Sequence, residues 1–326
     1  MQQRLYPIAT VLIMLSGACK DVFEVRAGSL NLITEQRVAA SATSDITVMT
    51  QNLYVGADVD LVIRALGTPD GGDDFPALQF AIETVGKTDF PARARAIADE
   101  IARRRPHAVG LQDNINVSLV GGLVRLVDHD ALLVDADRVT IDAASGQDFS
   151  VNLGQVAQGV VLIRGWVFAR TTIAGRAVTF ASAHTEANLA GAPPGLLERI
   201  RAAQVGEMVA TLGAGEPIVL VGDLNDTPGS PMYRVLAGAG YTDTWTAMHP
   251  GAGAEGLTCC HVADLSDHVA TFDQRIDYVW TRGLARDDGK VQGSIDRFGN
   301  VPGDRLPGPA YPIWPSDHAG LVASLR

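Results

Sequence analysis

The chain has 326 residues, of which 47% are hydrophobic, and this is enough to bury a sizeable core. Lysine and arginine number 26 against 37 aspartates and glutamates, which gives a formal net charge of -11. This balance excludes a protein that coats nucleic acid with a basic surface, but it allows an enzyme with a local cationic or metal-bearing cleft.

The N-terminal residues 1–19 have the pattern of an export signal. A positively charged start is followed by an apolar run over residues 5–15 and by small residues before Cys19. The run is short for a membrane span, and a buried N-terminal helix is the alternative. Cys19 also resembles a lipoprotein acylation site, although Leu15 lies one position further from it than usual. We expect a signal peptide or lipoprotein-type leader and an exported protein that is periplasmic, secreted or tethered to a membrane through Cys19.

Residues 20–44 are predicted to lead into the fold, and residues 45–326 to form one domain. Ile46–Thr50 reads as a strand that ends at Gln51-Asn52. The segment from Asp58 to Thr88 is rich in glycine and aspartate near its centre, and we interpret it as an insertion or flexible loop. A single domain is expected because the candidate site residues extend from Asn52 to His318.

Helices and strands are predicted in alternation beyond this segment. Asp89 is the expected N-cap of a helix that ends at Arg103–Arg105, where the arginines are interpreted as a solvated helix end, with phosphate binding as the alternative. Leu196–Leu212 is predicted as a second helix, and Ser230 begins a third. Strand-like runs recur at residues 107–111, 159–164, 177–183, 217–221, 275–280 and 318–325. Continuously apolar runs mixed with helices favour an α/β fold of two packed sheets.

Polar residues recur where the predicted strands end or begin. They are Gln51-Asn52, Gln112-Asp113, His184, Asp223 with Asn225, Asp277 in Arg275-Ile276-Asp277-Tyr278, and Ser316-Asp317-His318 before the last strand. Asp and Asn are common at turns for local structural reasons, so each motif alone is weak. Their shared placement predicts that the side chains converge at one edge of the sheets.

This ordered set of motifs resembles the endonuclease/exonuclease/phosphatase superfamily, the DNase I-like phosphodiesterases, from Val48 to the C-terminus. Members of that family show Q-N, L-Q-E, T-H, G-D-x-N, R-[IL]-D-Y and S-D-H in the same order. The resemblance implies a four-layered α/β sandwich of two packed mixed β-sheets flanked by helices. It also implies hydrolysis of phosphate esters with Mg²⁺, or with Mn²⁺ in its place, which agrees with an Asp and Asn cluster because Mg²⁺ prefers oxygen ligands.

The resemblance further implies that Asn52, Asp113 and Asp317 hold the metal ion. Asp113 stands where the family has a glutamate, and its side chain is one methylene shorter. We expect altered metal affinity or preference, and loss of activity is the alternative, because metal sites tolerate little displacement of their ligands.

The same resemblance assigns catalytic roles to five residues. Asp223 would orient or deprotonate the attacking water, and Asn225 would donate to a phosphate oxygen. His318 would contact the scissile phosphate, with Asp277 bonded to its other ring nitrogen. His184 would protonate the leaving oxygen or hold a phosphate oxygen, and a histidine at this place is typical of the DNase I, sphingomyelinase and phosphoinositide-phosphatase branches.

We therefore expect a monomeric, Mg²⁺-dependent phosphodiester hydrolase whose substrate is nucleic acid or a phospholipid headgroup. The alternatives are a sphingomyelinase-like phospholipid phosphodiesterase and a non-catalytic binding module with a degraded metal site. Trp245, Trp280 and Trp314 are predicted to lie in the core. The adjacent Cys259 and Cys260 are compatible both with two thiols and with a vicinal disulfide.

Overall fold

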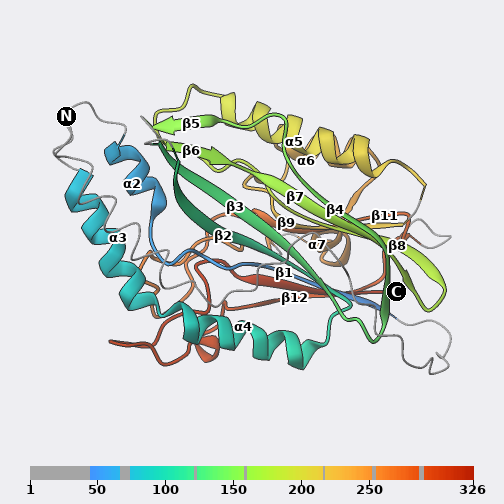
Figure 1. The fold of residues 1–326 in the computed structure, drawn as a ribbon. Coiled ribbons are helices and arrows are strands. Elements are labelled where there is room, and N and C mark those ends of the chain that lie inside the picture. The colour runs from blue at the N-terminus through green and yellow to red at the C-terminus, as the bar shows by residue number, and fades with distance from the viewer. Residues whose placement is uncertain are drawn as a thin grey trace.

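The described part of the chain folds into two β-sheets that pack face to face between helices (Figure 1). The computed structural model describes residues 45–66, 74–120, 123–157, 160–215, 217–251, 255–285 and 290–326. The predicted leader, with Cys19, and the segment 20–44 lie outside these residues. Among the helices that are described, none combines the length and the apolar character needed to span a membrane.

The first sheet places the first strand of the domain at its centre. Its order is β12-β13-β1-β2-β3-β6-β5, with the bounds Gly293–Phe298, Gly320–Leu325, Ile46–Asn52, Ala108–Val120, Leu123–Val134, Val160–Ile163 and Gly154–Ala157. Strand β1 pairs antiparallel with β13 and parallel with β2. The end of β1 therefore lies beside the residues that precede the last strand.

The second sheet contains the strand that carries the G-D-x-N motif. Its order is β10-β11-β9-β8-β7-β4, with the bounds Thr242–Asp243, Asp277–Arg282, Ile218–Asp223, Arg176–His184, Gly165–Ile173 and Val139–Asp148. Strands β8 and β9 are parallel, and helix α5, Leu196–Leu212, makes the crossover between them. All residues of β9 are buried, as its continuous apolar run predicts.

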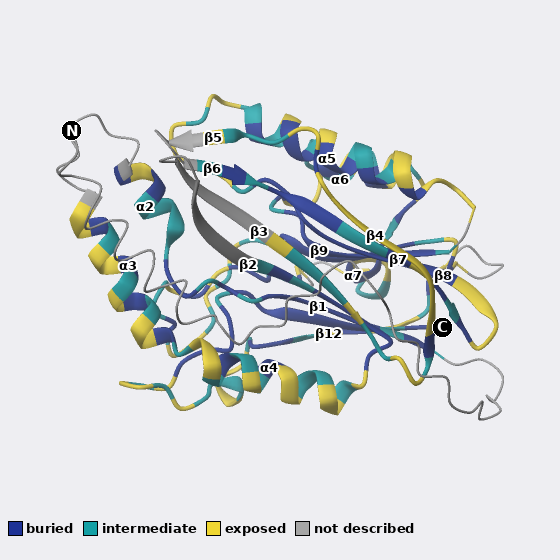
Figure 2. Ribbon diagram, in the orientation of Figure 1, coloured by how far each residue is buried: buried dark blue, intermediate teal, exposed yellow. Residues whose placement is uncertain are grey.

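Three apolar interfaces hold the four layers together (Figures 1 and 2). Phe180 and Val221 belong to the core between the two sheets. Ile97 of α4, Phe90–Arg104, packs on the outer face of the first sheet. Met208 of α5 and Met232 of α6, Pro231–Gly238, pack on the outer face of the second. The predicted four-layered α/β sandwich is confirmed.

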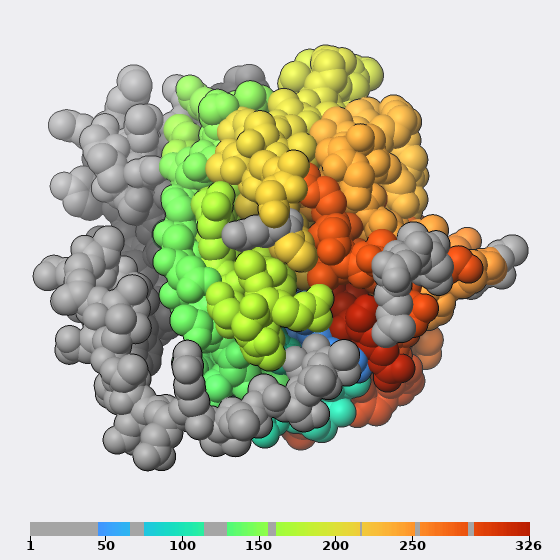
Figure 3. All heavy atoms as spheres, turned by 90° about the vertical axis from the view of Figure 1, so that its right-hand side faces the viewer, coloured from blue at the N-terminus to red at the C-terminus, as the bar shows by residue number. Residues whose placement is uncertain are grey.

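Strands β1 and β13 run in opposite directions, so the polar end of β1 and the end of the chain lie at opposite ends of the sandwich. The chain closes with β13 at the right of Figure 1, and Figure 3 views that end, where the green middle and the red C-terminal parts of the chain both reach the surface. Strand β1 is antiparallel to β13, so its last residue, Asn52, lies at the opposite end. The polar residues at the end of β1 and before β13 therefore lie together at one end of the sandwich.

Several local predictions are confirmed by the helix caps. The side chain of Asp89 accepts a hydrogen bond from the backbone of Ala92, and that of Ser230 accepts one from Tyr233. Helix α5 has the predicted bounds, Leu196–Leu212. Trp280 and Trp314 are fully buried and Trp245 is 9% exposed, so all three lie in the core as expected.

The prediction of a loop over residues 58–88 is wrong. Helix α2 occupies Val59–Leu66 and helix α3 occupies Asp74–Thr88, whereas residues 67–73 between them are not described. Each helix buries an apolar side, represented by Ile63 in α2 and Ala77 in α3. The glycine- and aspartate-rich stretch thus separates two amphipathic helices. The remaining short helices are α7, Thr244–Met248, and a 3₁₀ turn at Pro302–Asp304.

Gly222 precedes the last residue of β9 and cannot be replaced without a backbone shift. Its φ of 145° lies in a region that side-chain-bearing residues rarely adopt, and a Cβ atom would overlap the carbonyl oxygen of Ala183 on β8. Since Ala183 and Gly222 are directly paired, the close approach of these two strands depends on the missing side chain.

We expect Gly222→Ala to lower the free energy of unfolding by about 2–4 kcal/mol, because it adds backbone strain and overpacking. The matched control is Gly206→Ala in the middle of α5, where a Cβ would meet no atom within 4 Å. That change should raise the stability by about 0.5–1 kcal/mol. Urea denaturation of both variants measures the difference, and equal stabilities would contradict the role given to Gly222.

Candidate active site

Three neighbouring strands of the second sheet place their polar residues in one row. Asp223 at the end of β9 is paired with His184 at the end of the parallel strand β8. On its other side Asp223 is paired with Asp277, the first residue of the antiparallel strand β11. All three side chains are buried. The register of these strands therefore places two carboxylates and an imidazole side by side.

The first sheet contributes a second group at the same end. Asn52, the last residue of β1, is paired with Gln112 inside the parallel strand β2, and Asp113 follows directly. Asp317 and His318 precede β13 on the other side of β1. The carbonyl oxygen of His318 accepts a hydrogen bond of 3.3 Å from the Gln51 side chain. The polar strand ends of both sheets thus meet.

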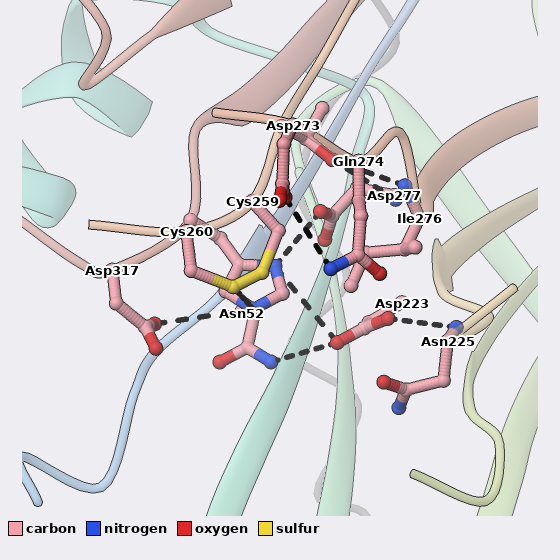
Figure 4. The surroundings of a disulfide bond; sticks show 12 residues. Asn52, Asp223, Asn225, Cys259, Cys260, Asp273, Gln274, Ile276, Asp277 and Asp317 are labelled. Carbon is pink, nitrogen blue, oxygen red and sulfur yellow. Dashed lines mark hydrogen bonds and ion pairs between the residues drawn. A yellow bond between two sulfur atoms is a disulfide. The ribbon is translucent and has the colours of Figure 1, made fainter. Parts of the chain in front are cut away.

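Direct hydrogen bonds join the two groups across the sandwich (Figure 4). The amide nitrogen Nδ2 of Asn52 donates to Oδ2 of Asp223 at 3.0 Å. Nδ1 of His318 lies 2.8 Å from Oδ2 of Asp277 and 3.9 Å from Oδ2 of Asp223. Nε2 of His184 lies 3.5 Å from the same Asp223 oxygen. The structure therefore brings together Asn52, His184, Asp223, Asp277 and His318.

Asn225 is oriented by a turn that follows β9. Its φ is 49°, in the left-handed region that asparagine tolerates better than most residues. Its backbone N–H donates to Oδ1 of Asp223 at 2.9 Å, and its side-chain amide donates to the carbonyl of Thr185 at 3.1 Å. A carboxamide nitrogen carries two hydrogens, so one donor of Asn225 is left for a ligand in the cavity.

Asp113 lies in an irregularity of β2. The pairing of β2 with β3 shifts register between Leu111 and Asn114, and Asp113 there has a φ of 66°. Its Oδ2 accepts a hydrogen bond from the backbone of Val55 at 3.1 Å. A bulge of this kind changes the direction of a side chain. The backbone at this position thus departs from regular strand geometry where the sequence has aspartate in place of the expected glutamate.

Arg93 holds the loops that carry the first-sheet group. This fully buried side chain from α4 donates to the carbonyl oxygens of Leu53, Tyr54 and Pro315 at 2.8, 3.1 and 3.3 Å. Burial lowers the pKa of Arg93 to about 10, and nearby carboxylates, Asp317 first among them, oppose that shift. The guanidinium remains charged at neutral pH and ties the end of β1 to the segment before Asp317.

The charges of His318 and its two aspartate neighbours depend on each other. Burial by itself lowers the pKa of His318, but the carboxylates of Asp277 and Asp317 outweigh it and raise this pKa well above 6.5. Burial raises the pKa of Asp277, and the positive charge of His318 opposes that shift. The short contact between them is therefore an imidazolium–carboxylate pair at neutral pH. Asp277 thereby fixes the ring so that Nε2 is directed away from it.

The site opens on a cavity of about 430 Å³. Its lining includes Asn52, Asp113, His184, Asp223, Asn225, Asp317 and His318, which are seven of the eight residues expected from the sequence. The eighth, Asp277, does not line the cavity and lies behind His318. Arg103, Arg104 and Arg105 are not part of the lining; Arg103 and Arg104 pair with Glu100 on their own helix, as expected of a solvated helix end.

Sequence reasoning missed several residues of this cavity. Arg164 is buried between β6 and β7, and its Nη1 lies 2.7 and 3.1 Å from the two ring nitrogens of His184. Asp58, directly before α2, and Asp60, in the first turn of α2, form part of the wall, whereas the sequence predicts a loop here. Burial raises the pKa of Asp60, and Asp58 adds to that shift. A single arginine between two strands forms no motif, so no sequence signal pointed to Arg164.

Cys260 also lines the cavity, and the sequence is compatible with either a thiol or a disulfide at this position. Cys259 and Cys260 form a vicinal disulfide, and Sγ of Cys260 lies 3.8 Å from Nε2 of His318. The disulfide is drawn in Figure 4 beside Asp317, Asn52 and Asp223.

Comparisons with known proteins agree with this fold. The sequence model of the Endonuclease/Exonuclease/phosphatase family matches residues 49–318. A comparison with curated proteins gave no match. Among solved structures, the family protein from Bacteroides thetaiotaomicron has a TM-score of 0.54 at 14% identity over 86% of this chain and 95% of that chain. The catalytic domain of human Nocturnin with bound sulfate has a TM-score of 0.51 at 16% identity over 86% and 94%.

A humanized TDP2 from D. rerio has a TM-score of 0.51 at 13% identity over 87% of this chain and 100% of that chain. Identities this low establish a shared fold and nothing finer. The family match, in contrast, covers most of the chain and includes every residue of the site from Asn52 to His318. The protein therefore belongs to the endonuclease/exonuclease/phosphatase family.

Proposed function

We propose that this protein is a divalent-metal-dependent phosphodiester hydrolase. The observation that carries the proposal is the buried Asp223, which is held by Asn52 and lies beside the His318–Asp277 pair at the bottom of an open cavity. A binding module has no need of a buried carboxylate next to a charged imidazole pair, because such groups cost stability unless they serve chemistry. This favours catalysis over the non-catalytic alternative.

The oxygen atoms of Asn52, Asp113 and Asp317 fit a magnesium ion. Burial raises the pKa of Asp317 to about 6, and the Asp113 carboxylate acts in the same direction, whereas His318 opposes it. Two carboxylates and one neutral amide oxygen on one cavity wall are the ligand type that Mg²⁺ prefers, and a cation would relieve their repulsion. When bound there, the ion would neutralise charge on the phosphate and on the leaving oxygen. Mn²⁺ has similar ligand preferences and is the expected substitute.

The side chains of Asp223, His318 and Asn225 would activate the water and bind the phosphate. Asp223 is an acceptor in the cavity and would orient the attacking water and take its proton. His318, charged through its pairing with Asp277, would donate from Nε2 to a phosphate oxygen. The remaining amide hydrogen of Asn225 would donate to another phosphate oxygen. These three groups lie at or directly beside strand ends, and their hydrogen bonds to neighbouring residues favour precise positioning.

His184 accepts a hydrogen bond from Arg164, whereas a general acid needs a proton that it can donate to the leaving oxygen. The guanidinium of Arg164 is only a donor, so the imidazole nitrogen that it contacts acts as an acceptor. We infer that His184 holds Arg164 towards the phosphate and keeps Asp223 in place. Arg164 then supplies a fixed positive charge near the developing charge of the transition state.

The excess of carboxylates over cationic side chains in the cavity lining limits the kind of substrate that it can bind. Among its described lining residues Arg164 is the single arginine or lysine, whereas the carboxylates number six: Asp58, Asp60, Asp113, Glu186, Asp223 and Asp317. Binding along a nucleic-acid strand needs several lysines or arginines that follow the phosphates. The cavity instead favours a substrate that inserts one phosphodiester, such as a strand end, a small diester or a lipid headgroup.

We expect His318→Ala to lower kcat for bis(4-nitrophenyl) phosphate at least about 100-fold in the presence of Mg²⁺, because the phosphate loses its cationic donor. The matched control is His268→Ala, an exposed histidine outside the cavity, which should leave the rate unchanged. Absorbance of released nitrophenolate measures both. Equal rates in the two variants would rule out the proposed role, and no hydrolysis by the wild-type protein with any divalent metal would favour the binding module.

The same assay with natural substrates separates the substrate classes. Nicking of plasmid DNA would support an endonuclease, and shortening of a linear strand from its end would support an exonuclease. Release of phosphocholine from sphingomyelin vesicles would support the lipid alternative. The charge distribution predicts that internal nicking is the slowest of the three.

We expect Asp113→Asn to raise the Mg²⁺ concentration needed for half-maximal activity by about 10–100-fold, since a neutral amide replaces a charged ligand. Asp137→Asn removes the same charge from an exposed turn and is the control. Activity measured against Mg²⁺ concentration after treatment with a chelator gives both constants. An unchanged Mg²⁺ requirement would exclude Asp113 from the metal site.

The raised pKa of Asp317 predicts a pH-dependent stability of the metal-free protein. Between the unfolded value of about 3.9 and the folded value of about 6, the folded state binds more protons, so stability falls as pH rises through this range. The difference of roughly 2 units amounts to as much as about 3 kcal/mol above pH 6.

Asp317→Asn should therefore be more stable than the wild type at pH 7 in a chelator and should lose this slope. Asp99→Asn, an exposed helix residue, is the control and should keep it. Thermal or urea unfolding between pH 4 and 7 measures the effect, and Mg²⁺ should restore stability only to proteins that retain Asp317. Parallel pH profiles for all three proteins would contradict the assignment.

A further inference from the structure

The vicinal cysteines lie beside His318 and next to the proposed metal ligand Asp317, whose Oδ1 is 4.0 Å from Nε2 of His318. Cys259 is buried and Cys260 is exposed, and both sulfur atoms lie within 4.8 Å of a ring nitrogen of His318. The closest approach, from Sγ of Cys260 to Nε2 of His318, is 3.8 Å. Two sulfurs and an imidazole nitrogen are a ligand set for a softer ion than Mg²⁺.

The position of the cysteines beside His318 is maintained by the backbone on both sides of the pair. The backbone N–H of Ala319 donates to the carbonyl of Thr258 at 2.8 Å, and that of His261 donates to the carbonyl of Asp317 at 2.8 Å. Cys259 also forms an antiparallel bridge with His318. These main-chain bonds do not involve the sulfur atoms, so they remain when the disulfide opens.

The ring of His318 is oriented so that its outer nitrogen, Nε2, faces the sulfur atoms. Nδ1 of His318 is engaged with Asp277 at 2.8 Å, which leaves Nε2 towards the sulfurs. Histidines that bind metal characteristically hold a carboxylate with their other ring nitrogen. A tetrahedral zinc ion with Zn–S and Zn–N bonds of usual length separates its ligand atoms by roughly 3.3–3.8 Å, which the observed sulfur–nitrogen distance matches.

We propose that reduction of the Cys259–Cys260 disulfide creates a zinc site formed by the two sulfurs and Nε2 of His318. A dithiol reductant supplies two electrons and two protons, the S–S bond breaks to give two thiols, and the reductant leaves as its own disulfide. Zinc then displaces three protons to the solvent, one from each thiol and one from Nε2 of the charged His318, and binds the two thiolates and this nitrogen. A fourth position remains for water.

The exposure of Cys260 makes the disulfide accessible to a reductant. Cys260 is exposed on the cavity side, so a small dithiol can reach its sulfur, and accessible disulfides are the ones that exchange most readily. The zinc ion would occupy the nitrogen of His318 that we assign to the phosphate. The reduced, zinc-loaded protein would therefore be inhibited, a consequence that rests on the proposed function, whereas the metal site itself does not.

The test uses the full chain with Cys19→Ser, so that Cys259 and Cys260 are its only thiols. The protein is examined oxidised and after reduction with a phosphine, which binds zinc weakly, and is titrated with Co²⁺ as a spectroscopic probe and then with Zn²⁺. We expect a thiolate-to-cobalt absorption band with about one Co²⁺ per reduced chain, bleached by Zn²⁺, and no band in the oxidised protein.

Cys260→Ser is the matched variant, because serine at an exposed position preserves the volume of the side chain. It should weaken Co²⁺ binding at least about tenfold, and His318→Ala should do the same while keeping a weaker thiolate band. A band of equal strength in the oxidised protein, or unchanged binding in Cys260→Ser, would overturn the proposal. The spectra give this answer whether or not the protein hydrolyses any phosphodiester.

In the activity assay, Zn²⁺ should inhibit the reduced parent protein at concentrations that leave the oxidised protein and reduced Cys260→Ser active. If the cobalt band appears but Zn²⁺ inhibits all three proteins at the same concentration, zinc also binds the oxygen ligands. That result would contradict inhibition through the cysteine site, whereas the cysteine metal site itself would stand.

Discussion

A buried carboxylate at the end of β9 sets the arrangement of both sheets. Asp223 is 1% exposed, and a negative charge that has left water must be matched by donors. The donors come from the end of β1 in the opposite sheet, through Asn52, and from the backbone of Asn225. The relative position of the sheets that gives Asp223 the Asn52 donor also places His318 against Asp277. Packing and chemistry therefore depend on the same few contacts.

Unfavourable backbone conformations gather around this carboxylate. Tyr54, Asp113 and Asn225 all have positive φ, and Gly222 adopts a φ of 145° next to Asp223. Such conformations cost stability and persist where surrounding structure enforces them. Here the enforcement comes from Arg93, which binds the carbonyls of Leu53 and Tyr54, and from the pairing of β8 with β9. The molecule thus holds several unfavourable backbone conformations at the edge of its cavity.

The sequence allowed the buried elements and the converging residues to be predicted, because both leave a local pattern. Strand β9 is a continuous apolar run and α5 has apolar residues at helical spacing, whereas β4 is exposed along nearly its whole length and gave no signal. The region of α2 and α3 was misread because its glycine- and aspartate-rich centre outweighed two short apolar faces. Arg164 could not be predicted, since it lies where the chain crosses from β6 in one sheet to β7 in the other, and this crossing is a property of the topology.

The cavity wall is formed partly by residues at the ends of the sheet strands and partly by residues in and directly before helix α2. The groups proposed to act on the phosphate lie at or beside strand ends, whereas Asp60 and Ile63 belong to α2 and Asp58 directly precedes this helix. Changes in α2 would alter this part of the cavity wall without moving the groups to which we assign the phosphate. The structure thus separates the part of the cavity that could determine recognition, in and before one short helix, from the part assigned to hydrolysis, at the strand ends.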